Sequence, residues 1–503
     1  MWYSRIVYGV GNEPLIPSRE PYDYIVLLPV YNEALPLLTA GIQSIIDQNY
    51  FRERVTLHIS FDSDERSKLY LDLVDWLNEH SSDVALYGGT DFVNPPHVNA
   101  ETIFGVYQGV RVFVHKFPHG GKRSTQAQTF LHIEKQVQLD RLDRTILVLL
   151  DSDNFTYDNA FHNIASTFDR RPEKRALSGY MTCMSSGDNS SKFWNLIQDV
   201  EYLSGEMGRS FELMLGTVNC LPGGFTAVRL DVMEQSIPES NMTVAERYFG
   251  ELPIDTLTDY HRCYLGEDRY LSHLLHQTLP RYSMGFCPAA RAKTDPPPTL
   301  QALVRQRRRW FLGALSNEVY MLTDREIWSK FGFLCTFKTI QLAFRTNFFS
   351  QVVMSIFAFA DVNSNPSSYI PLAISGGIPL LLNYLAALAT AIKLGHSKVF
   401  LLQPVMLIVM TISQLFIDFH AVFTFTQRSW GGPRHAAQDD DETEGEGHAT
   451  QQPTDADSRA AAAATAADQF SSVPMHEDTE LIEVVGHPNA SSVHQRLTPH
   501  EAA

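Results

Sequence analysis

Two carboxylates directly after a buried apolar segment are the strongest local sign of chemistry in the sequence. Residues Thr145–Leu150 are apolar after the first position and lead into Asp151, Ser152 and Asp153. Carboxylates two positions apart after a buried strand can hold one hard cation, and Mg²⁺ and Mn²⁺ prefer oxygen ligands. Such a cation holds a diphosphate and neutralises the charge that builds on it as it leaves. The alternative is a polar loop with two acids, because Asp-x-Asp is short and recurs by chance.

Two earlier apolar segments also end in polar side chains. Tyr24–Leu28 leads into Pro-Val-Tyr-Asn-Glu, which contains Tyr31 and Glu33, and Val55–Ser60 leads into Asp62. Ligands bind at the carboxyl ends of the strands in open α/β sheets. We therefore expect these side chains at one edge of a sheet, where the Asp62 carboxylate can hydrogen-bond a nucleobase or ribose. Taken singly, each segment also fits a solvated turn.

Two glycine-rich segments suit close approach of a ligand to the backbone. In Gly120–Ser124, two glycines precede Lys122, and the amides and cations of this segment can wrap phosphates. The spacing of a P-loop is absent, so nucleotide hydrolysis is not indicated. Leu221–Phe225 places Gly223 in a turn where a sugar can approach the main chain, although a purely structural turn fits equally well.

Consecutive acids stand at the expected start of a helix. In Gly266–Arg269, either Glu267 or Asp268 can accept the proton of an attacking hydroxyl, and Arg269 can orient that hydroxyl. The alternative is a helix that simply begins with favourable negative charges.

The segment Gln306–Trp310 has three arginines between a glutamine and a tryptophan. Trp310 can stack on a sugar ring, Gln306 can hydrogen-bond hydroxyl groups, and arginines such as Arg309 can face a diphosphate. The alternative is a basic anchor at a membrane surface, because apolar segments follow.

Short apolar segments alternate with helical patterns from about Tyr22 to Thr226, which predicts an α/β domain with a largely parallel sheet. From Leu265 to Leu322 the pattern is helical and strongly charged. The five cysteines are widely spaced without a C-x-x-C pattern, so neither a disulfide framework nor a zinc site is expected. No signal peptide is expected, because Met1–Glu20 lacks a long enough apolar core.

Three later segments are candidates for contact with a membrane. Ile370–Ile392 is 23 residues long and apolar enough to cross a hydrocarbon layer of roughly 30 Å. Val399–Phe423 is also long enough but carries Asp418, so its last turns are expected to face protein or water, or to end at the interface. Polar residues interrupt Phe331–Ala360 and suit an interfacial helix that enters the membrane. We expect two or three spans.

The last segment, Gly431–Ala503, is acidic. It holds 14 acidic residues against 3 Arg and so accounts for −11 of the formal charge of −17. Because it has no apolar period, we expect a disordered tail. The remaining charge says little about the folded part, and we expect no nucleic-acid partner.

These motifs, in this order, resemble those of the processive family 2 glycosyltransferases. Their individual residues resemble those of chitin synthases in particular. The likeness runs from about Tyr22 to Arg434, and the ordered series is far more specific than any one motif. Its members are Pro-Val-Tyr-Asn-Glu at 29–33, Gly-Lys-Arg at 121–123, Asp-Ser-Asp at 151–153, Gln198 with Glu201 and Tyr202, Leu-Pro-Gly-Gly-Phe at 221–225, Gly-Glu-Asp-Arg at 266–269, Gln-Arg-Arg-Arg-Trp at 306–310 and Ser-Trp-Gly at 429–431.

The resemblance implies an N-terminal segment over residues 1–21 and a cytosolic, Rossmann-like GT-A domain over residues 22–325. Interfacial and transmembrane helices over 326–430 and the acidic tail over 431–503 would follow. The implied location is a membrane, expected to be the plasma membrane.

It further implies Asp268 as general base, Asp153 as a ligand of Mg²⁺ or Mn²⁺, and Asp151 beside the nucleotide or donor sugar. Four side chains would surround the UDP: Tyr31, Glu33, Asp62 and Lys122. The acceptor end and the diphosphate would be lined by Gln306, Arg309, Trp310, Glu267, Arg269 and Gly223.

In the implied reaction, the 4-hydroxyl of a growing chain attacks the anomeric carbon of UDP-GlcNAc as metal-bound UDP leaves, and each added sugar extends β-1,4-linked chitin through a membrane channel. The two or three expected membrane spans are few for a complete channel. Either the chain forms homo-oligomers or interfacial helices complete the pore, and the sequence leaves both open.

Two other functions compete with chitin synthesis. A hyaluronan or other β-glycan synthase would share the Asp-x-Asp and Gln-x-x-Arg-Trp positions but usually has different residues in the other motifs. A catalytically silent membrane scaffold would keep the fold, yet it has no reason to retain the acids at positions 151, 153 and 268.

Overall fold

The computed structural model describes residues 20–80, 87–88, 101–135, 139–183, 189–238, 240–250, 254–297, 299–342 and 416–428, with three further positions between 381 and 388. The chain divides into two compact units, residues 1–443 and 444–503, and every described residue belongs to the first.

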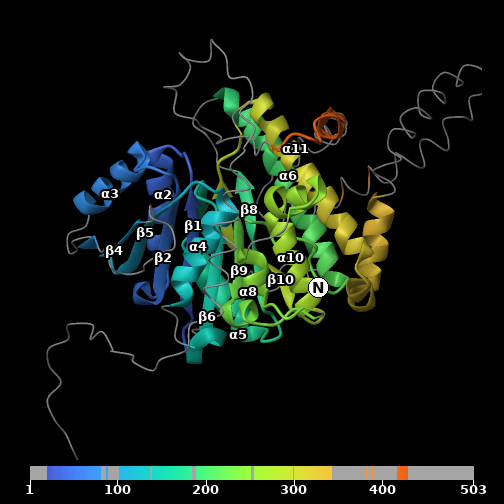
Figure 1. Ribbon diagram of the computed structural model, residues 1–503, viewed down its shortest axis with the longest axis horizontal. Helices are drawn as coiled ribbons and strands as arrows, with labels where there is room; N and C mark the ends of the chain where they lie inside the picture. The colour runs from blue at the N-terminus through green and yellow to red at the C-terminus, as the bar shows by residue number, and fades with distance from the viewer. Residues whose placement is uncertain are drawn as a thin grey trace, which may run out of the picture. The chain divides into compact units, whose positions relative to one another are not determined.

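A ten-stranded sheet organises this first unit (Figure 1), in the order β3-β4-β5-β2-β1-β6-β9-β8-β10-β7. The strands are β1 (Asp23–Val30), β2 (Val55–Asp62), β3 (Tyr87–Gly88), β4 (Glu101–Tyr107), β5 (Val110–Phe117), β6 (Thr145–Leu150), β7 (Asn154–Thr156), β8 (Ala176–Cys183), β9 (Phe225–Arg229) and β10 (Met284–Thr294). The three strands predicted from apolar segments are confirmed as β1, β2 and β6.

Strand β1 is buried on both faces, which explains its continuous apolar sequence. Tyr24, Val26 and Leu28 pack into one hydrophobic core, while Ile25 and Leu27 pack into a second core. Successive side chains of a strand point to opposite faces, so an apolar residue is needed at every position when helices cover both faces.

The sheet is mixed, so the prediction of a largely parallel sheet is wrong outside its centre. β5, β2, β1 and β6 are parallel neighbours, as are β8 and β10. β9 lies between β6 and β8 and runs antiparallel to both, and β4 and β7 are also antiparallel to their neighbours. The β4–β5 hairpin turns at Gln108 and Gly109, whose φ angles of 49° and 87° match a tight two-residue turn.

The prediction of helix from Leu265 to Leu322 is wrong for β10. In that strand Ala290 and Ala292 are buried while Arg291 and Lys293 are half-buried. This alternation has the period of a strand. Its apolar signal is weak, because the buried residues are small and charged residues stand between them.

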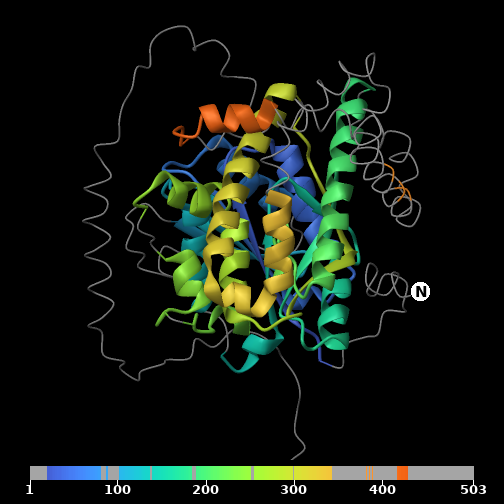
Figure 2. The same ribbon diagram turned by 90° about the vertical axis from the view of Figure 1, so that its right-hand side faces the viewer.

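Helices cover both faces of the sheet (Figures 1 and 2). One core includes side chains of α2 (Leu35–Ile46), α3 (Lys68–His80) and α5 (Ala160–Arg170). The other includes side chains of α4 (Lys122–Glu134), α7 (Leu230–Met233), α8 (Val244–Phe249) and α10 (Glu267–Thr278). Further helical segments up to residue 323 are η1 (Arg52–Arg54), η2 (Leu139–Arg144), α6 (Asn189–Met214), α9 (Leu257–Tyr260), the π-helical turn η3 (His261–Leu265) and α11 (Leu300–Thr323).

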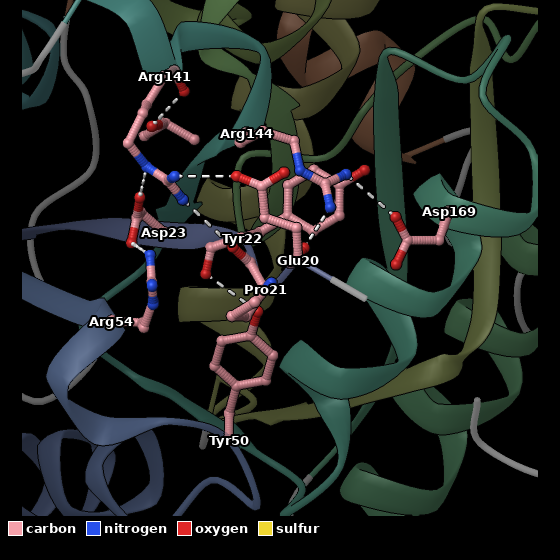
Figure 3. Close-up of polar contacts among 10 residues, drawn as sticks. Glu20, Pro21, Tyr22, Asp23, Tyr50, Arg54, Arg141, Arg144 and Asp169 are labelled. Atoms are coloured by element: carbon pink, nitrogen blue, oxygen red, sulfur yellow. Dashed lines mark hydrogen bonds and ion pairs between the residues drawn. The ribbon is translucent and has the colours of Figure 1, made fainter. Parts of the chain in front are cut away.

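A network of ion pairs fixes the chain where β1 begins. Asp23 accepts a hydrogen bond of 2.9 Å from Arg54 and one of 2.8 Å from Arg141, and Arg144 pairs with Asp169 at 3.1 Å. The network contains three arginines and three acids: Arg54, Arg141, Arg144, Glu20, Asp23 and Asp169 (Figure 3). We refer to it as the amino-edge network.

Two helices follow α11. In residues 325–342, Ile327 and Phe331 pack against Met321 at the end of α11. In residues 416–423, Ala421 packs against Phe311 of α11. Figure 2 shows helix 416–423 in orange beside α11 in yellow.

Over the part of the chain that the structure describes, no helix combines the length and the apolar character needed to span a membrane. Most of each predicted membrane segment (Ile370–Ile392, Phe331–Ala360 and Val399–Phe423) and the whole predicted disordered tail lie outside the described residues.

Candidate active site

The residues predicted to bind the ligand follow three neighbouring strands. β1 pairs in parallel with β2 on one side, where Val30 lies opposite Phe61, and with β6 on the other, where Leu27 lies opposite Leu149. The chain therefore leaves all three strands at the same edge of the sheet. The predicted residues at this carboxyl edge are Tyr31, Glu33, Asp62, Asp151 and Asp153.

Lys122, the first residue of α4, joins two of the predicted carboxylates. Its Nζ lies 2.7 Å from Asp151 Oδ1 and 3.0 Å from Glu267 Oε1. Burial alone would lower the pKa of this amine, but the two carboxylates raise the pKa above its usual range. Lys122 therefore stays charged and brings together segments 145 positions apart in the chain.

The turn Leu221–Phe225 lies against this cluster because its two glycines have no side chains. A Cβ atom on Gly223 would lie 3.1 Å from Lys122 Nζ and 3.6 Å from Asp268 Cβ. A Cβ atom on Gly224 would lie 3.6 Å from Asp151 Oδ2. The turn thus connects the acids that follow β6 with the acids that begin α10.

Three donors orient the Asp268 carboxylate. Its Oδ1 accepts a 2.8 Å hydrogen bond from the backbone N–H of Arg269. Its Oδ2 lies 3.4 Å from the N–H of Gly223 and 3.5 Å from Cys220 Sγ. Burial, and then the nearby Asp268 charge, raise the pKa of the Cys220 thiol, so the sulfur remains a neutral donor. The sequence contains no local signal for this role of Cys220.

Glu33 is held next to the Asp-Ser-Asp segment. Ser152 Oγ donates to Glu33 Oε1 at 2.7 Å, and the N–H of Tyr31 donates to Oε2 at 3.0 Å. Burial raises the pKa of Glu33 to about 7, with a further upward contribution from Asp153 and an opposing one from the Ser152 hydrogen bond. The predicted segment after β1 therefore meets the predicted segment after β6.

Asp62 faces the loop before α4. Its Oδ1 accepts a hydrogen bond of 2.8 Å from the N–H of Gly120, and its Oδ2 accepts one of 3.1 Å from Gly121. His119 Nδ1 lies 3.0 Å from Oδ2, and the His119 ring centroid is 5.5 Å from that of Tyr31. Sequence reasoning gave His119 no role.

The segment Gln306–Trp310 lies on α11 and contacts α6. Arg307 Nε lies 2.9 Å and 3.0 Å from the two carboxylate oxygens of Glu201, and the Arg307 guanidinium lies over the Trp310 ring at 4.0 Å. The Nε2 atom of Gln306 is buried without a hydrogen-bond partner among the described residues. Arg307 is engaged in structure. Arg309 and Trp310 are half-buried.

Arg308 links α11 to a helix far along the chain. Its Nε donates to Thr424 Oγ1 at 2.6 Å, and its Nη2 donates to the carbonyl oxygens of Thr424 at 2.5 Å and Gln427 at 2.9 Å. The guanidinium therefore caps the carboxyl end of helix 416–423. Neighbouring arginines of one motif thus have different partners, which the motif alone does not reveal.

Helix α11 also packs tightly against the start of α10. A Cβ atom on Gly313 would lie 2.7 Å from the carbonyl oxygen of Leu265 and 2.8 Å from Gly266 Cα. Asn317 Nδ2 donates to the Gly266 carbonyl at 3.1 Å. The helix with Gln306 and Trp310 is therefore fixed relative to Glu267 and Asp268, while Arg307 and Trp310 contact residues of α6.

The cluster suits a cation that takes most of its ligands from a substrate. Among the described residues, no group of three or more His, Cys, Asp or Glu side chains is arranged to hold a metal ion. Mg²⁺ commonly binds through one or two carboxylates plus substrate phosphates, and Asp151 with Asp153 offers oxygen ligands of that kind.

The fold and the site define an α/β domain with its acidic site at the carboxyl edge of parallel strands. The chain belongs to the chitin synthase family, because the family model described as "Chitin synthase" matches residues 126–461.

Individual relatives agree with this assignment. The chain is 31% identical to chitin synthase 7 of Verticillium dahliae over 423 residues, which are 82% of this chain and 56% of the relative. It is 31% identical to chitin synthase G of Aspergillus niger over 455 residues, 87% of this chain and 56% of the relative. The chain spans about half the length of the curated relatives it matches.

Among solved structures, the chain is similar to a mannosyltransferase from Pyrobaculum calidifontis in complex with GDP-Man and Mn²⁺. The sequence identity is 13%, the TM-score is 0.41, and the match covers 80% of this chain and 92% of the other. So distant a likeness adds nothing to the family assignment.

Proposed function

We propose that the chain is a processive, inverting glycosyltransferase with a GT-A domain. It moves N-acetylglucosamine from UDP-GlcNAc to the 4-hydroxyl of a growing β-1,4 chain and so makes chitin. Family membership supports this proposal, and one observation carries it at the site. Lys122 bridges Asp151 and Glu267, and the Asp268 carboxylate lies directly beside Gly223 in the same cluster.

The donor side of the reaction uses the residues after β1 and β6. Asp153, with Asp151, would hold Mg²⁺ or Mn²⁺, which when bound neutralises charge on the departing diphosphate. Lys122 contributes a fixed positive charge to the same place, and because its amine is paired on both sides, it is already oriented when the nucleotide arrives. Tyr31 and Glu33 lie on the nucleotide side of the cluster.

The acceptor side uses Asp268 and α11. Asp268 takes the proton of the 4-hydroxyl while the hydroxyl oxygen forms a bond to the anomeric carbon. The bond from that carbon to the β-phosphate oxygen breaks with its electron pair, and UDP leaves from the opposite face. Gln306 and Trp310 then bind the acceptor chain, with Gln306 Nε2 as a hydrogen-bond donor and Trp310 as a stacking surface. Arg309, Glu267, Arg269 and Gly223 complete this side.

A donor screen tests the proposal. Membranes that contain the full chain are incubated with labelled UDP-sugars and either Mg²⁺ or Mn²⁺. We expect UDP-GlcNAc to be consumed into insoluble polymer that chitinase degrades, and Asp268→Asn to abolish incorporation at unchanged protein level. Soluble product, or incorporation of glucuronic acid, would instead identify a hyaluronan or another β-glycan synthase. A chain that binds no UDP would be a scaffold.

We further propose that the enzyme is integral to a membrane, with residues 22–325 in the cytosol and residues 326–430 at and in the bilayer. Large apolar side chains on the two helices after α11 support this proposal: Phe333 is 76% exposed, Phe416 72% and Phe423 83%. Exposed apolar groups of this size favour contact with lipid or protein. Retention in the pellet after alkaline carbonate extraction of membranes is the expected result, and release into the supernatant would contradict it.

A further inference from the structure

Lys338 is a buried lysine on the helix that follows α11. It lies in residues 325–342, and its Nζ is 2.5 Å from Glu212 Oε1 on α6. Both side chains are 9% exposed. Lysine and glutamate are almost never buried unless they are paired, so this ion pair ties the helix to α6.

The second oxygen of Glu212 holds the chain that follows α6. Glu212 Oε2 accepts a buried hydrogen bond of 2.9 Å from the backbone N–H of Asn219. Two residues later, the N–H of Leu221 donates to Ser272 Oγ of α10 at 2.8 Å. The backbone of residues 219–221 is therefore fixed from two sides, by α6 and by α10.

Cys220 lies between these two anchors and contacts the proposed base. Its Sγ is 3.5 Å from Asp268 Oδ2, and the N–H of Gly223 is 3.4 Å from the same oxygen. The second of these contacts is already longer than a usual N–H···O hydrogen bond, so a small displacement of the backbone would remove it. The orientation of Asp268 is thus sensitive to the position of residues 219–223.

Lys338 keeps the buried Glu212 carboxylate charged and in place. The charges of Arg209 and Arg269 also act on Glu212, but Arg209 is directed to Glu206, with its Nε 3.1 Å from Oε2. A buried carboxylate that loses its paired cation rearranges or takes up a proton. Either change weakens its hold on the backbone N–H group, because an ionised acceptor forms the stronger hydrogen bond.

We propose that Lys338 is a positioning residue for the catalytic base. Through Glu212 and the backbone of Asn219, it keeps the Cys220 thiol donating to Asp268. The inference rests on the proposed function, because it assumes that Asp268 is the base. It gives the helix after α11 a part in the chemistry, besides its proposed place at the bilayer.

The test is the steady-state rate at which the detergent-purified full chain forms polymer from labelled UDP-GlcNAc. Bound UDP per chain counts the folded sites. We expect Lys338→Met to lower kcat per folded site by about 10- to 100-fold and to leave KM for UDP-GlcNAc within about twofold of the wild type. A displaced base slows the chemical step without changing how the donor binds. Lys338→Arg keeps the charge and should restore most of kcat.

A second lysine on the same helix provides the matched control. Lys330 Nζ pairs with Glu326 at 2.7 Å and donates to the carbonyl oxygen of Gln277 on α10, so Lys330→Met also loosens the helix from the domain. Its kcat should stay near that of the wild type, because neither contact involves Glu212 or residues 219–221. Where Lys338→Met does not fold, Lys338→Gln is the milder variant. It keeps a hydrogen-bond donor, and its kcat should still fall about threefold or more.

A double-mutant cycle tests whether Lys338 acts through Cys220. Cys220→Ala removes the thiol donor, and kcat should fall about 5- to 10-fold, because hydrogen bonds to charged groups are the stronger ones. Cys220→Ser keeps a donor and should lose less. In the Lys338→Met background, Cys220→Ala should lower kcat by less than about twofold further, because the contact is already lost.

The results separate this inference from the proposed function. A wild-type kcat in Lys338→Met, an equal loss in Lys330→Met, or losses that multiply in the double variant would each overturn the inference and leave the proposed function in place. A rise in KM alone would make Lys338 a contributor to donor binding and would also overturn it. If Asp268→Asn keeps the wild-type kcat, or if the wild-type chain forms no polymer, the proposed function fails and the inference fails with it.

Discussion

The two edges of the sheet carry charged clusters of opposite character. In the amino-edge network, three arginines meet three acids, and each pair lies within hydrogen-bonding distance (Figure 3). At the carboxyl edge, the predicted site has more acids than bases. Its acids are Glu33, Asp62, Asp151, Asp153, Glu267 and Asp268, and its bases are Lys122 and Arg269.

We interpret the amino-edge network as charges that stabilise the fold, and the acidic excess at the carboxyl edge as charges that bind a ligand. A balanced network at the start of β1 needs no further ion. An acidic excess close to a single buried lysine is costly for the isolated protein, because like charges in a partly buried site repel. A divalent cation with a nucleotide would relieve that repulsion. The comparison therefore predicts that changes at the carboxyl edge affect chemistry, while matched changes at the amino edge affect only stability.

The largest effect is expected for Asp268→Asn. The amide keeps the shape of the side chain but cannot accept the proton of the 4-hydroxyl, so polymer formation should fall by about 10²- to 10⁴-fold. Labelled GlcNAc incorporation measures this loss. Asp169→Asn in the amino-edge network is the control, and an equal loss of activity there would remove the distinction between the edges.

The next effect is expected for Lys122→Met, which removes the cation between Asp151 and Glu267. Breaking a buried ion pair costs roughly 3–5 kcal/mol, and the partial exposure of Asp151 reduces the expected loss of unfolding free energy to about 2–3 kcal/mol. Thermal unfolding with and without Mn²⁺ measures it. Mn²⁺ should stabilise the variant more than the wild type, because the cation replaces part of the missing charge. Equal stabilisation of both would mean that the cation binds elsewhere.

A smaller effect is expected on the pH dependence of stability, through the side chain of Glu33. Burial raises the pKa of Glu33 to about 7 in the folded chain, so between pH 4.5 and 7 the folded state keeps a proton that the unfolded state has lost. Stability from this group is therefore present at low pH and is lost as pH rises toward 7. Glu33→Gln should flatten this dependence by on the order of 1–2 kcal/mol between pH 5 and 7. Thermal midpoints across that range test the sign, and an unchanged slope in the variant would contradict it.

The smallest effect is expected for Arg141→Gln at the amino edge. The Arg141 side chain is 25% exposed and its partner Asp23 is 24% exposed. Pairs this open to solvent contribute about 0.2–1 kcal/mol, so the thermal midpoint should fall slightly and the activity should not change. A large loss of activity in this variant would show that the amino edge takes part in function.

The sequence predicts best those features that depend on neighbouring residues. β1, β2 and β6 contain the short, mostly apolar segments from which they were predicted, and α10 begins at Glu267 as expected for consecutive acids at a helix start. β9 and β10 were not predicted, because their partners lie far away in the chain and their buried residues are small or interrupted by charge. The mixed order of the sheet follows from these distant pairings.

In the candidate site, too, some features follow from neighbouring residues and others depend on how distant segments pack. Residue types and order predict that Asp151, Glu267 and Asp268 belong together, and the structure brings the first two to Lys122 and the third to Gly223. Their catalytic roles stay predictions. Cys220 beside Asp268 and His119 beside Asp62 could not be predicted, because each contact depends on how separate loops pack.

The Arg308 contact has a consequence for the segment between the two helices that it joins. By joining residues 116 positions apart, it turns the polypeptide between α11 and helix 416–423 into a closed loop whose two ends are tied to one guanidinium. Substitution of this one arginine would therefore loosen both ends of the segment at once, because the same guanidinium holds the end of helix 416–423 against α11.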